Sequence, residues 1–552
     1  MKLRKELAHL LFPEVDKNIS DLEKIYPNRQ LSEDAMVTRF APSPTGFLHT
    51  GSLFASMVSW RYAKQSNGVF FVRLEDTDTK REIEGSGDEV LTELNIFGIN
   101  PDESFVTGGL YGPYVQSERK WIYDIVIKYM IENDLAYPCF CTHEELDEIR
   151  KKQESLKVNP GYYGEYAKCR KLSVEEMIQN IKNGESYVIR FKSMGNELEK
   201  IGFDDEIRGH IEFPQNVQDL VIMKGDKLPT YHFAHLVDDH FMRTTHVTRG
   251  EEWMSSVPIH LQLFDAMGWV RPKYAHLPVI MKMDDGKRRK LSKRKDEEAS
   301  VKYFLEKGYP IEGFLEYLMT IANTNFEEWR IQNPFANIFD FNLTFDKMSL
   351  DGGLFDLEKI KSICKETLGN MPAPLIAKKA LDWAKIYNQE FFQVASSNIQ
   401  FFESILDIER GGEKPRKDYE KYSDIFPIIN FMYDSEYESL LKDTLPFNER
   451  VSQQDIIDVL ELFIKNNGLD LNEEEWFENL KVIASSLNYT PKSKEYKKNP
   501  ELYKGHIGDF AEIIRISVST KKSSPNFYYV LKILGKDKVI SRLQKVISLL
   551  KD

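Results

Sequence analysis

A strand, a proline- and glycine-rich loop, a helix and a second strand follow one another within about 40 residues near the N-terminus. Residues 37–40 form a short strand pattern, which Pro42-Ser-Pro-Thr-Gly46 interrupts. Residues 53–64 then have apolar side chains at helical spacing, and residues 69–74 are an apolar run typical of a buried strand. This order is typical of a parallel βαβ unit, so it predicts an α/β domain.

Along the remainder of the chain the expected type of secondary structure changes twice. At about 150 residues per domain, 552 residues predict three or four domains. We expect a helical extension at 1–34 and an α/β domain in two halves, 35–138 and 229–296, around an α+β insertion at 139–228. Beyond residue 296 apolar residues recur at helical spacing, as in Ile456 to Lys465, which predicts an all-α C-terminal half.

Composition excludes several classes of protein. Four cysteines in the whole chain do not form a disulfide scaffold, and no apolar run approaches the roughly 18 residues of a membrane span. The apolar run His9–Phe12 is too short for a signal peptide. These features predict a cytoplasmic protein. The net charge of −13 argues against a nucleic-acid partner, but it is an average over the chain and a contact surface is local.

Two segments carry the residues expected of phosphate chemistry. In Arg39–Gly51 a rigid loop places backbone amides and His49 at a helix N-terminus, where an anion is stabilised. In Lys287–Lys295 seven of nine residues are basic, and Ser292 follows the turn at Gly286, as in a mobile loop that grips phosphate. Each segment alone is better explained as a tight turn or as a solvated charge run.

The two segments occur together, in this order and about 240 residues apart, around the insertion. They resemble the two signatures of class I aminoacyl-tRNA synthetases, at His49-Thr-Gly-Ser52 and Lys290-Leu-Ser-Lys-Arg294. Six further blocks, in register between about Met36 and Arg330, resemble the glutamyl-tRNA synthetase family. These blocks are Arg39–Gly46, Arg73–Asp78, Gly112–Arg119, Pro229–Tyr231, Val237–His240 and Arg249–Trp253.

The resemblance implies a Rossmann-type catalytic domain and a glutamate–tRNA ligase reaction. ATP, with Mg²⁺ on its phosphates, activates L-glutamate to glutamyl-adenylate, and the glutamyl group then moves to the 3′-terminal adenosine of tRNA(Glu). By similarity the catalytic residues are His49, Lys290 and Lys293, which stabilise the departing pyrophosphate. The positions that match the family's ATP site are Pro42, Thr45, Gly46, His49, Gly51, Ser52, Lys290, Leu291, Ser292, Lys293 and Arg294.

Glutamate brings two carboxylates and one ammonium group, which guanidinium and carboxylate side chains recognise. By similarity Arg39 and Arg249 bind the carboxylates and Glu75 binds the α-amino group. The positions that match the family's glutamate site are Arg39, Ser43, Glu75, Tyr231, His235, Arg249 and Trp253. His235 departs from the family, which has asparagine there, and unperturbed imidazole titrates near neutral pH. We expect His235 to line the glutamate site.

Metal binding stays open. Cys139, Cys141 and Cys169 lie where some relatives hold zinc, but zinc prefers four ligands and only Tyr162 or Tyr166 is a candidate for the fourth. Ordinary reduced thiols explain the same cysteines equally well. For Asp238-Asp-His240 the family pattern favours a wall of the active site over a metal site.

By resemblance, the insertion at 139–228 binds the acceptor end of tRNA, residues 297–375 contact its stem and the helical residues 376–552 read its anticodon. We expect a monomer without membrane contact, and charging of tRNA(Gln) as well as tRNA(Glu) stays open. Three alternatives remain: a glutaminyl-tRNA synthetase, a nucleotidylyltransferase with the same His-X-Gly signature, and a binding module without catalysis.

Overall fold

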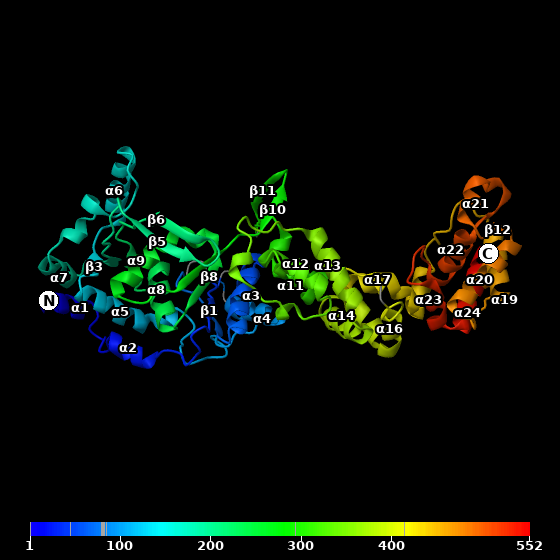
Figure 1. The fold of residues 1–552 in the computed structure, drawn as a ribbon, viewed down its shortest axis with the longest axis horizontal. Coiled ribbons are helices and arrows are strands. Elements are labelled where there is room, and N and C mark those ends of the chain that lie inside the picture. The colour runs from blue at the N-terminus through cyan, green and yellow to red at the C-terminus, as the bar shows by residue number, and fades with distance from the viewer. Residues whose placement is uncertain are drawn as a thin grey trace. The chain divides into compact units, whose positions relative to one another are not determined.

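The computed structural model describes residues 2–44, 46–78, 83, 85–292, 294–412 and 415–551. The chain divides into two compact units (Figure 1). The first comprises Met1–Tyr303 and Leu318–Asp356, and the second comprises Phe304–Tyr317 and Leu357–Asp552.

The βαβ unit expected near the N-terminus is present. Strand β1 (Val37–Phe40) leads into helix α3 (Thr50–Gln65), which returns to strand β2 (Val69–Val72). The two strands pair in parallel, with Val37 opposite Val69 and Phe40 opposite Val72. The loop before α3 therefore opens at the carboxyl end of β1, where ligands bind in parallel α/β sheets.

A second sheet of the first unit has the order β6-β5-β9-β8. Strands β8 (His246–Gly250) and β9 (Lys273–Leu277) are parallel, and helices α8 (Tyr231–Phe241) and α9 (Val257–Met267) accompany them in sequence. The hairpin of β5 (Lys200–Asp205) and β6 (Gly209–Pro214) comes from the segment 139–228, yet Asp205 pairs with Tyr274 of β9. This pairing brings Asp205 beside the strand that follows α9.

The rest of the segment 139–228, together with residues 136–138, forms an antiparallel sheet with two helices. Strands β3 (Ala136–Cys139), β4 (Val188–Phe191) and β7 (Val221–Met223) lie in the order β3-β4-β7. Helices α6 (His143–Ser155) and α7 (Val174–Lys182) each begin with a capping box, Thr142 with Glu145 and Ser173 with Glu176.

The N-terminal extension is helical and packs on the first unit. Helix α1 (Lys2–Leu11) buries Leu7, Ala8 and Leu11 in the core that also contains α5 (Lys120–Glu132). The other elements up to Gln332 are α2 (Ile19–Ile25), α4 (Ser86–Ile96), the antiparallel hairpin β10 (Met281–Asp284) and β11 (Lys287–Lys290), α10 (Val301–Lys307), α11 (Ile311–Ala322) and α12 (Phe326–Gln332); the stretch Phe304–Tyr317, from within α10 to within α11, belongs to the second unit.

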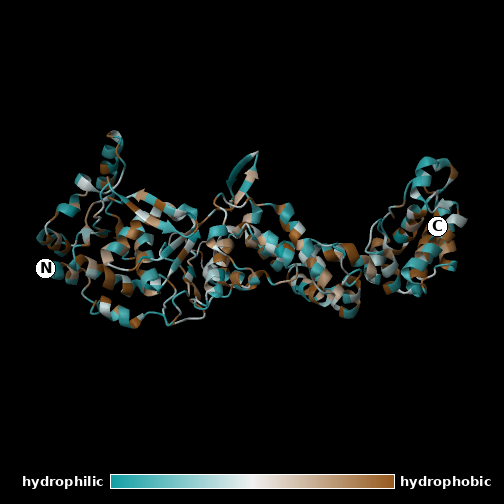
Figure 2. Cartoon of the chain, viewed as in Figure 1, coloured by the Kyte–Doolittle hydropathy of each residue, from teal (hydrophilic) through white to brown (hydrophobic). Residues whose placement is uncertain are grey.

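The C-terminal half is helical, as its spacing predicts, apart from the two-residue parallel pair β12 (Tyr489–Thr490) and β13 (Gly505–His506). Hydrophobic and hydrophilic residues alternate around its helices (Figure 2), and buried apolar residues from Leu368 to Ile547 form one core. The helices are α13 (Leu357–Asn370), α14 (Ala373–Tyr387), α15 (Gln389–Ser396), α16 (Ile399–Leu406), α17 (Ile425–Ile429), α18 (Asp434–Leu440), α19 (Gln453–Lys465), α20 (Glu473–Ser486), α21 (Ser493–Lys498), α22 (Ile507–Ser519), α23 (Phe527–Leu534) and α24 (Lys536–Lys551). Within the described ranges, every helix falls short of the length and apolarity needed to cross a membrane.

Candidate active site

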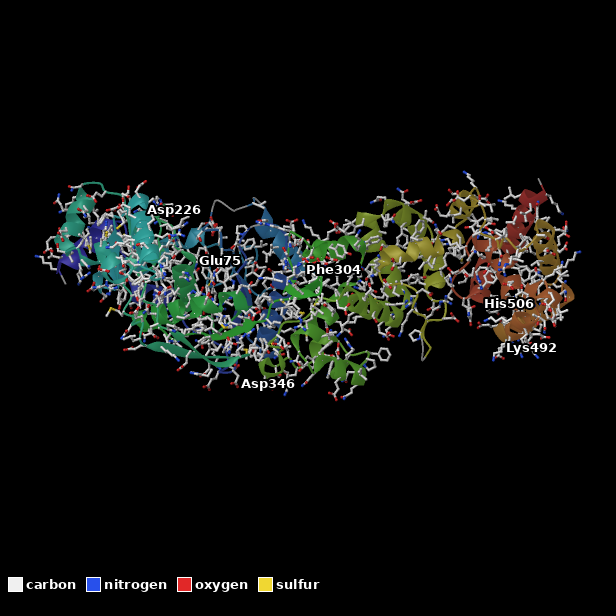
Figure 3. All side chains as sticks on the ribbon, turned by 90° about the horizontal axis from the view of Figure 1, so that it is seen from above. Glu75, Asp226, Phe304, Asp346, Lys492 and His506 are labelled. Carbon is white, nitrogen blue, oxygen red and sulfur yellow. The ribbon has the colours of Figure 1, made fainter. Side chains whose placement is uncertain are left out.

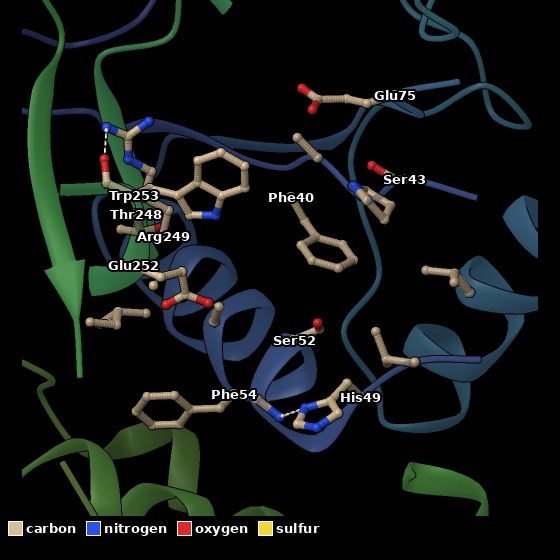
Figure 4. A pocket seen from close by; sticks show the side chains of 18 of the residues that line it. Phe40, Ser43, His49, Ser52, Phe54, Glu75, Thr248, Arg249, Glu252 and Trp253 are labelled. Atoms are coloured by element: carbon tan, nitrogen blue, oxygen red, sulfur yellow. Dashed lines mark hydrogen bonds between the residues drawn. The ribbon is translucent and has the colours of Figure 1, made fainter. Parts of the chain in front are cut away.

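A cavity of about 1150 Å³ lies in the first unit, between the βαβ unit and the end of β8 (Figure 4). Most of the residues that the sequence assigns to ATP and glutamate line it. They are Arg39, Pro42, Ser43, Gly46, His49, Gly51, Ser52, Glu75, Tyr231, Arg249, Trp253, Lys290, Leu291 and Ser292. Residues from five separate sequence blocks therefore face one space.

Four assigned residues are not among the lining residues. Thr45 and Lys293 lie outside the described residues. Arg294 is exposed, and its backbone N–H donates to Ser292 Oγ at 3.4 Å. His235 is fully buried and lies behind the cavity wall.

His49 is the N-cap of α3. Its Nδ1 accepts a hydrogen bond from the backbone N–H of Gly51 at 2.9 Å (Figure 4). Because Nδ1 is an acceptor, the proton of the neutral imidazole is on Nε2, which makes that nitrogen a donor. A hydrogen-bond donor beside a helix N-terminus suits a phosphate oxygen.

Six charged residues join the two halves of the sheet domain, and all of them except Glu75 are buried. Asp239 lies 3.3 Å from Arg39 Nε and 3.0 Å from Arg73 Nη1, and Arg73 Nη2 donates to Glu75 at 3.1 Å. Asp238 accepts from Arg119 Nε at 2.6 Å. Buried charges of this kind are stable only when paired, so Asp238 and Asp239 act as counter-ions here.

Glu75 presents its carboxylate to the cavity. Burial raises its pKa above the ordinary value, and the nearby guanidinium of Arg73 opposes that rise. Gln116 Nε2 donates to Glu75 Oε1 at 3.3 Å, so one carboxylate oxygen is already held by two donors. A buried carboxylate in this position suits an ammonium group.

Arg249 is buried, and its partners among the described residues are not acidic. Among the described residues no carboxylate lies within ion-pair distance of it, although only 6% of its surface is exposed. Its guanidinium instead donates to His276 Nε2 at 3.1 Å, to the Tyr231 hydroxyl at 3.2 Å and to the Trp253 carbonyl at 3.3 Å. A buried cation without a counter-ion is a strong binding site for an anion.

The comparisons with known proteins agree with this geometry. The family model described as "tRNA synthetases class I (E and Q), catalytic domain" matches residues 35–360, and an anticodon binding domain matches residues 407–547. The chain belongs to the class I tRNA synthetases (E and Q). The resemblance drawn from the sequence blocks is thereby confirmed.

Relatives match over nearly the full length of the synthetase. It is 46% identical to a glutamate–tRNA ligase of Acetivibrio thermocellus, over 98% of this chain and 100% of the relative. A glutamate–tRNA ligase of Clostridium perfringens strain SM101 is 44% identical, over 98% and 99%. The crystal structure of a glutamate tRNA ligase from Elizabethkingia meningosepticum in complex with its amino acid matches with a TM-score of 0.75 and 28% identity, over 93% of this chain and 99% of that one.

In this synthetase His235 supports the site from behind. Its Nδ1 lies 2.7 Å from Asp239 Oδ2 and its Nε2 lies 3.1 Å from the Tyr274 hydroxyl. Burial lowers its pKa to about 4, so the ring is neutral at pH 7. Asp239 is also the counter-ion of Arg39, so His235 contacts the glutamate site through that carboxylate.

The basic segment forms a hairpin more than a free loop. Its residues Lys287–Lys290 are strand β11, and Lys290 Nζ lies 2.8 Å from Glu252 at the cavity. Arg289 donates to Asp296 at 2.6 and 2.9 Å, and the backbone N–H of Ser292 donates to the same carboxylate at 2.9 Å. Asp296 therefore fixes the chain on either side of Leu291.

The three cysteines of the segment 139–228 converge. Cys141 Sγ lies 3.6 Å from Cys169 Sγ, and all three sulfurs lie within 4.8 Å of one another. The Tyr162 hydroxyl lies 3.5 Å from Cys139 Sγ and 3.2 Å from Cys141 Sγ. Of the two tyrosines considered from the sequence, Tyr162 is the one that contacts the sulfurs, whereas Tyr166 lies against Tyr163.

Several lining residues were not assigned from the sequence. Gln116 lies in the block Gly112–Arg119, which resembles the family, so the sequence could have indicated it as a site residue. Lys224 donates to the Thr77 carbonyl at 2.8 Å at the cavity, and no motif marks it. The apolar wall Leu277–Ile280 follows β9 and is recognisable only once the sheet order is known.

Proposed function

We propose that the protein is a glutamate–tRNA ligase that activates L-glutamate with ATP and transfers it to the 3′-terminal adenosine of tRNA(Glu), with release of pyrophosphate and AMP. The observation that carries this proposal is that Arg249, a buried cation with no carboxylate partner among the described residues, and the carboxylate of Glu75 line the same cavity. Glutamate has the complementary charges.

ATP would lie along the loop before α3. The backbone around Pro42, Gly46 and Gly51 and the His49 imidazole form a site suited to the phosphates, and Mg²⁺ would bind to the phosphates with few protein ligands. His49, Lys290 and Lys293 would stabilise the charge that develops as pyrophosphate leaves. The catalysis is electrostatic and positional, without a covalent enzyme intermediate.

Glutamate would lie between β8 and the Arg73–Asp78 segment. Arg39 and Arg249 would bind its carboxylates, Glu75 its α-amino group, and Ser43, Tyr231 and Trp253 would complete the pocket. The neutral, buried His235 would hold Asp239 and through it Arg39.

The tRNA would contact several parts of the chain. We assign the acceptor end to 139–228, the stem to 297–375 and the anticodon to 376–552, and the match of an anticodon binding domain to residues 407–547 supports the last assignment. We propose that the protein acts as a monomer in the cytoplasm. Charging of tRNA(Gln) as a second substrate is a separate outcome of the test below.

Charging of purified tRNA tests the proposal. The protein is incubated with ATP, Mg²⁺ and either tRNA(Glu) or tRNA(Gln), with labelled glutamate or glutamine. Glutamylation of tRNA(Glu) is expected. Attachment of glutamine would favour the glutaminyl enzyme, and adenylylation without transfer to tRNA would favour a nucleotidylyltransferase. No activity at all would favour a binding module.

We also propose that Cys139, Cys141, Cys169 and Tyr162 bind zinc. Zinc–sulfur bonds of about 2.3 Å place sulfurs about 3.8 Å apart in a tetrahedral site, close to the 3.6 Å between Cys141 and Cys169. Metal analysis of the purified protein is expected to give one zinc per chain. Cys141→Ser is expected to lower this content, whereas Cys364→Ala, at a buried position of α13, is not. Equal zinc content in both variants would contradict the assignment.

A further inference from the structure

Four histidines lie in and beside the surroundings of Arg249, which the proposed function assigns to a glutamate carboxylate: His260 and His276 contact Arg249 itself, and His232 and His235 lie next to His260. His276 belongs to β9 and His260 to α9, and both side chains are fully buried. Two of the four, His260 and His276, face the guanidinium with a ring nitrogen. The sequence blocks do not mark either of them.

Arginine has N–H donors and no acceptor, so a nitrogen that faces its guanidinium must be an acceptor. His276 Nε2 lies 3.1 Å from Arg249 Nε, and it therefore carries a lone pair. The proton of His276 is then on Nδ1, which lies 2.6 Å from Asp205 Oδ2. Asp205 thus fixes the tautomer of His276, and His276 fixes Arg249.

A second chain of contacts reaches Arg249 from α8. His260 Nδ1 lies 3.4 and 3.5 Å from the two terminal nitrogens of Arg249, so this nitrogen is also an acceptor. His260 then carries its proton on Nε2, which lies 3.1 Å from His232 Nδ1. The two imidazoles thus contact Arg249 through opposite nitrogens, Nε2 of His276 and Nδ1 of His260.

The ring charges agree with this assignment of protons. Burial lowers the pKa of both His260 and His276, and the charge of Arg249 lowers each of them further. Both rings are therefore neutral at pH 7. Arg39 has Asp239 as its counter-ion, whereas the partners of Arg249 among the described residues are neutral, so no protein carboxylate balances its charge there.

We infer that His276 and His260 are positioning residues that hold Arg249 by neutral acceptor nitrogens, so that its charge selects a carboxylate over an amide in the amino-acid side-chain pocket. This inference rests on the proposed function. A carboxylate compensates the buried charge, whereas the amide of glutamine does so only weakly and brings two N–H groups toward a donor-only guanidinium. The neutral imidazoles that hold Arg249 therefore favour glutamate over glutamine.

Amide substitutions test each nitrogen separately. Glutamine places its carbonyl oxygen close to the position of Nε2 and asparagine close to that of Nδ1, so each retains one of the two ring contacts. For His276, Gln retains the acceptor toward Arg249 and Asn removes it. For His260 the order is reversed, because Asn retains the acceptor toward Arg249 and Gln removes it.

The expected result is a crossed pattern in tRNA charging kinetics. His276→Asn and His260→Gln are expected to raise the KM for glutamate about tenfold, with kcat and the KM for ATP within about twofold of wild type. The preference for glutamate over glutamine is expected to fall by the same factor. His276→Gln and His260→Asn are expected to stay within about threefold of wild type in each quantity.

His246→Asn is the matched control. His246 is a buried histidine of β8, and among the described residues its ring hydrogen-bonds to the Thr245 hydroxyl and not to Arg249. Its KM for glutamate is expected to stay at the wild-type value. Melting temperatures of all five variants identify any general loss of fold.

Two outcomes are distinguishable. If the wild type charges glutamate but the two substitutions at each histidine have equal effects, the inference falls and the proposed function stands. A general packing role predicts such equal effects at each position. If the wild type charges no tRNA with glutamate, both the proposed function and the inference fall.

Discussion

The three buried arginines that line or support the cavity differ in how their charge is balanced. Arg39 and Arg73 share the carboxylate of Asp239, and Arg73 also donates to Glu75. Arg249 has only neutral partners among the described residues. The charge of Arg249 is therefore left for a substrate carboxylate to balance, whereas Arg39 would bind a carboxylate with its charge already shared with Asp239.

Replacement of Arg249 by lysine is expected to raise the KM for glutamate roughly 10- to 100-fold. Lysine keeps the charge but loses the planar fork that donates to several acceptors at once, and a hydrogen bond to a charged group contributes about 1.5–3 kcal/mol. The measurement is glutamate-dependent charging of tRNA. Arg271→Lys is the control, because Arg271 pairs with Asp265 on the surface, where such pairs contribute little. Equal KM values for both variants would contradict the role of Arg249.

The pH dependence of glutamate binding is expected to report Glu75. Because burial raises its pKa, this carboxylate takes up a proton at a higher pH than an ordinary glutamate as the pH falls. Protonation removes the charge that attracts the ammonium group, so the KM for glutamate is expected to rise as the pH is lowered from 8 to about 5. Free glutamate stays ionised over most of this range, since its side chain has a pKa of about 4.3.

The Glu75→Gln variant separates this effect from others. Its KM is expected to be high at every pH, because the amide carries no charge to lose. Glu154→Gln, at an exposed i,i+4 pair of α6, is expected to keep the wild-type profile. A KM that still rises at low pH in Glu75→Gln would assign the effect to another group.

At the residue scale the sequence predicted which residues line the cavity better than which residues hold them in place. Arg39, Glu75 and Arg249 lie in recognisable blocks and do line the cavity. Their partners come from distant parts of the chain, as His276 does for Arg249, and no local pattern encodes such contacts. The placement of His235 behind the wall depends on which face of α8 is buried, and its block alone did not decide this.

At the scale of elements, the β10–β11 hairpin is fixed by one acidic residue. Asp296 accepts from both terminal nitrogens of Arg289, pairs with Lys282 at 3.1 Å and accepts from the backbone of Ser292. These partners lower the pKa of Asp296, with Arg289 as the largest cause. The carboxylate therefore stays ionised at any working pH and holds the chain that carries the proposed ATP contacts.

Asp296→Asn is expected to slow tRNA-dependent pyrophosphate exchange about three- to tenfold, with little change in the KM for glutamate. The amide keeps the shape but removes the charge that holds Arg289 and Lys282, and each such contact contributes about 1 kcal/mol. Asp285→Asn is the control in the same hairpin. Its φ of 47° is a left-handed conformation that asparagine tolerates, so no change is expected there. A rise in the KM for glutamate alone would contradict this role of Asp296.

At the scale of the whole molecule, the sequence predicted the kinds of element more reliably than their pairing. Strand β1 is observed at Val37–Phe40, and the C-terminal half is helical. We expected residues 139–228 to be separate from the second half of the α/β domain. In the structure, their β5–β6 hairpin pairs with β9 of that half. Strand pairing depends on which edges meet in three dimensions, and hydrophobic periodicity does not encode that order.

The net charge of the protein is a poor guide to a tRNA partner because charged residues are distributed unevenly along the chain. The whole chain carries −13, yet α21 and the residue before it present Lys492, Lys494, Lys497 and Lys498. Among the described residues none of these four has an ion-pair partner, whereas the nearby Lys504 contacts Asp455. Figure 3 labels Lys492 and His506 in this part of the second unit. Lysines without acidic partners are suited to phosphates.

Binding of tRNA is therefore expected to weaken with salt, and the steepness of that dependence is expected to report α21. Each phosphate contact contributes a slope of about −0.9 to a plot of log Kobs against log salt concentration for duplex nucleic acid. The triple variant Lys494→Gln, Lys497→Gln, Lys498→Gln is expected to reduce the slope by one to three and to weaken binding at low salt, as measured by filter binding. The control replaces Lys378, Lys545 and Lys551 by glutamine. It changes the net charge equally, but those lysines are already paired with Asp382, Glu438 and Glu461. If both triple variants reduce the slope equally, total charge governs tRNA binding and α21 has no particular part in it.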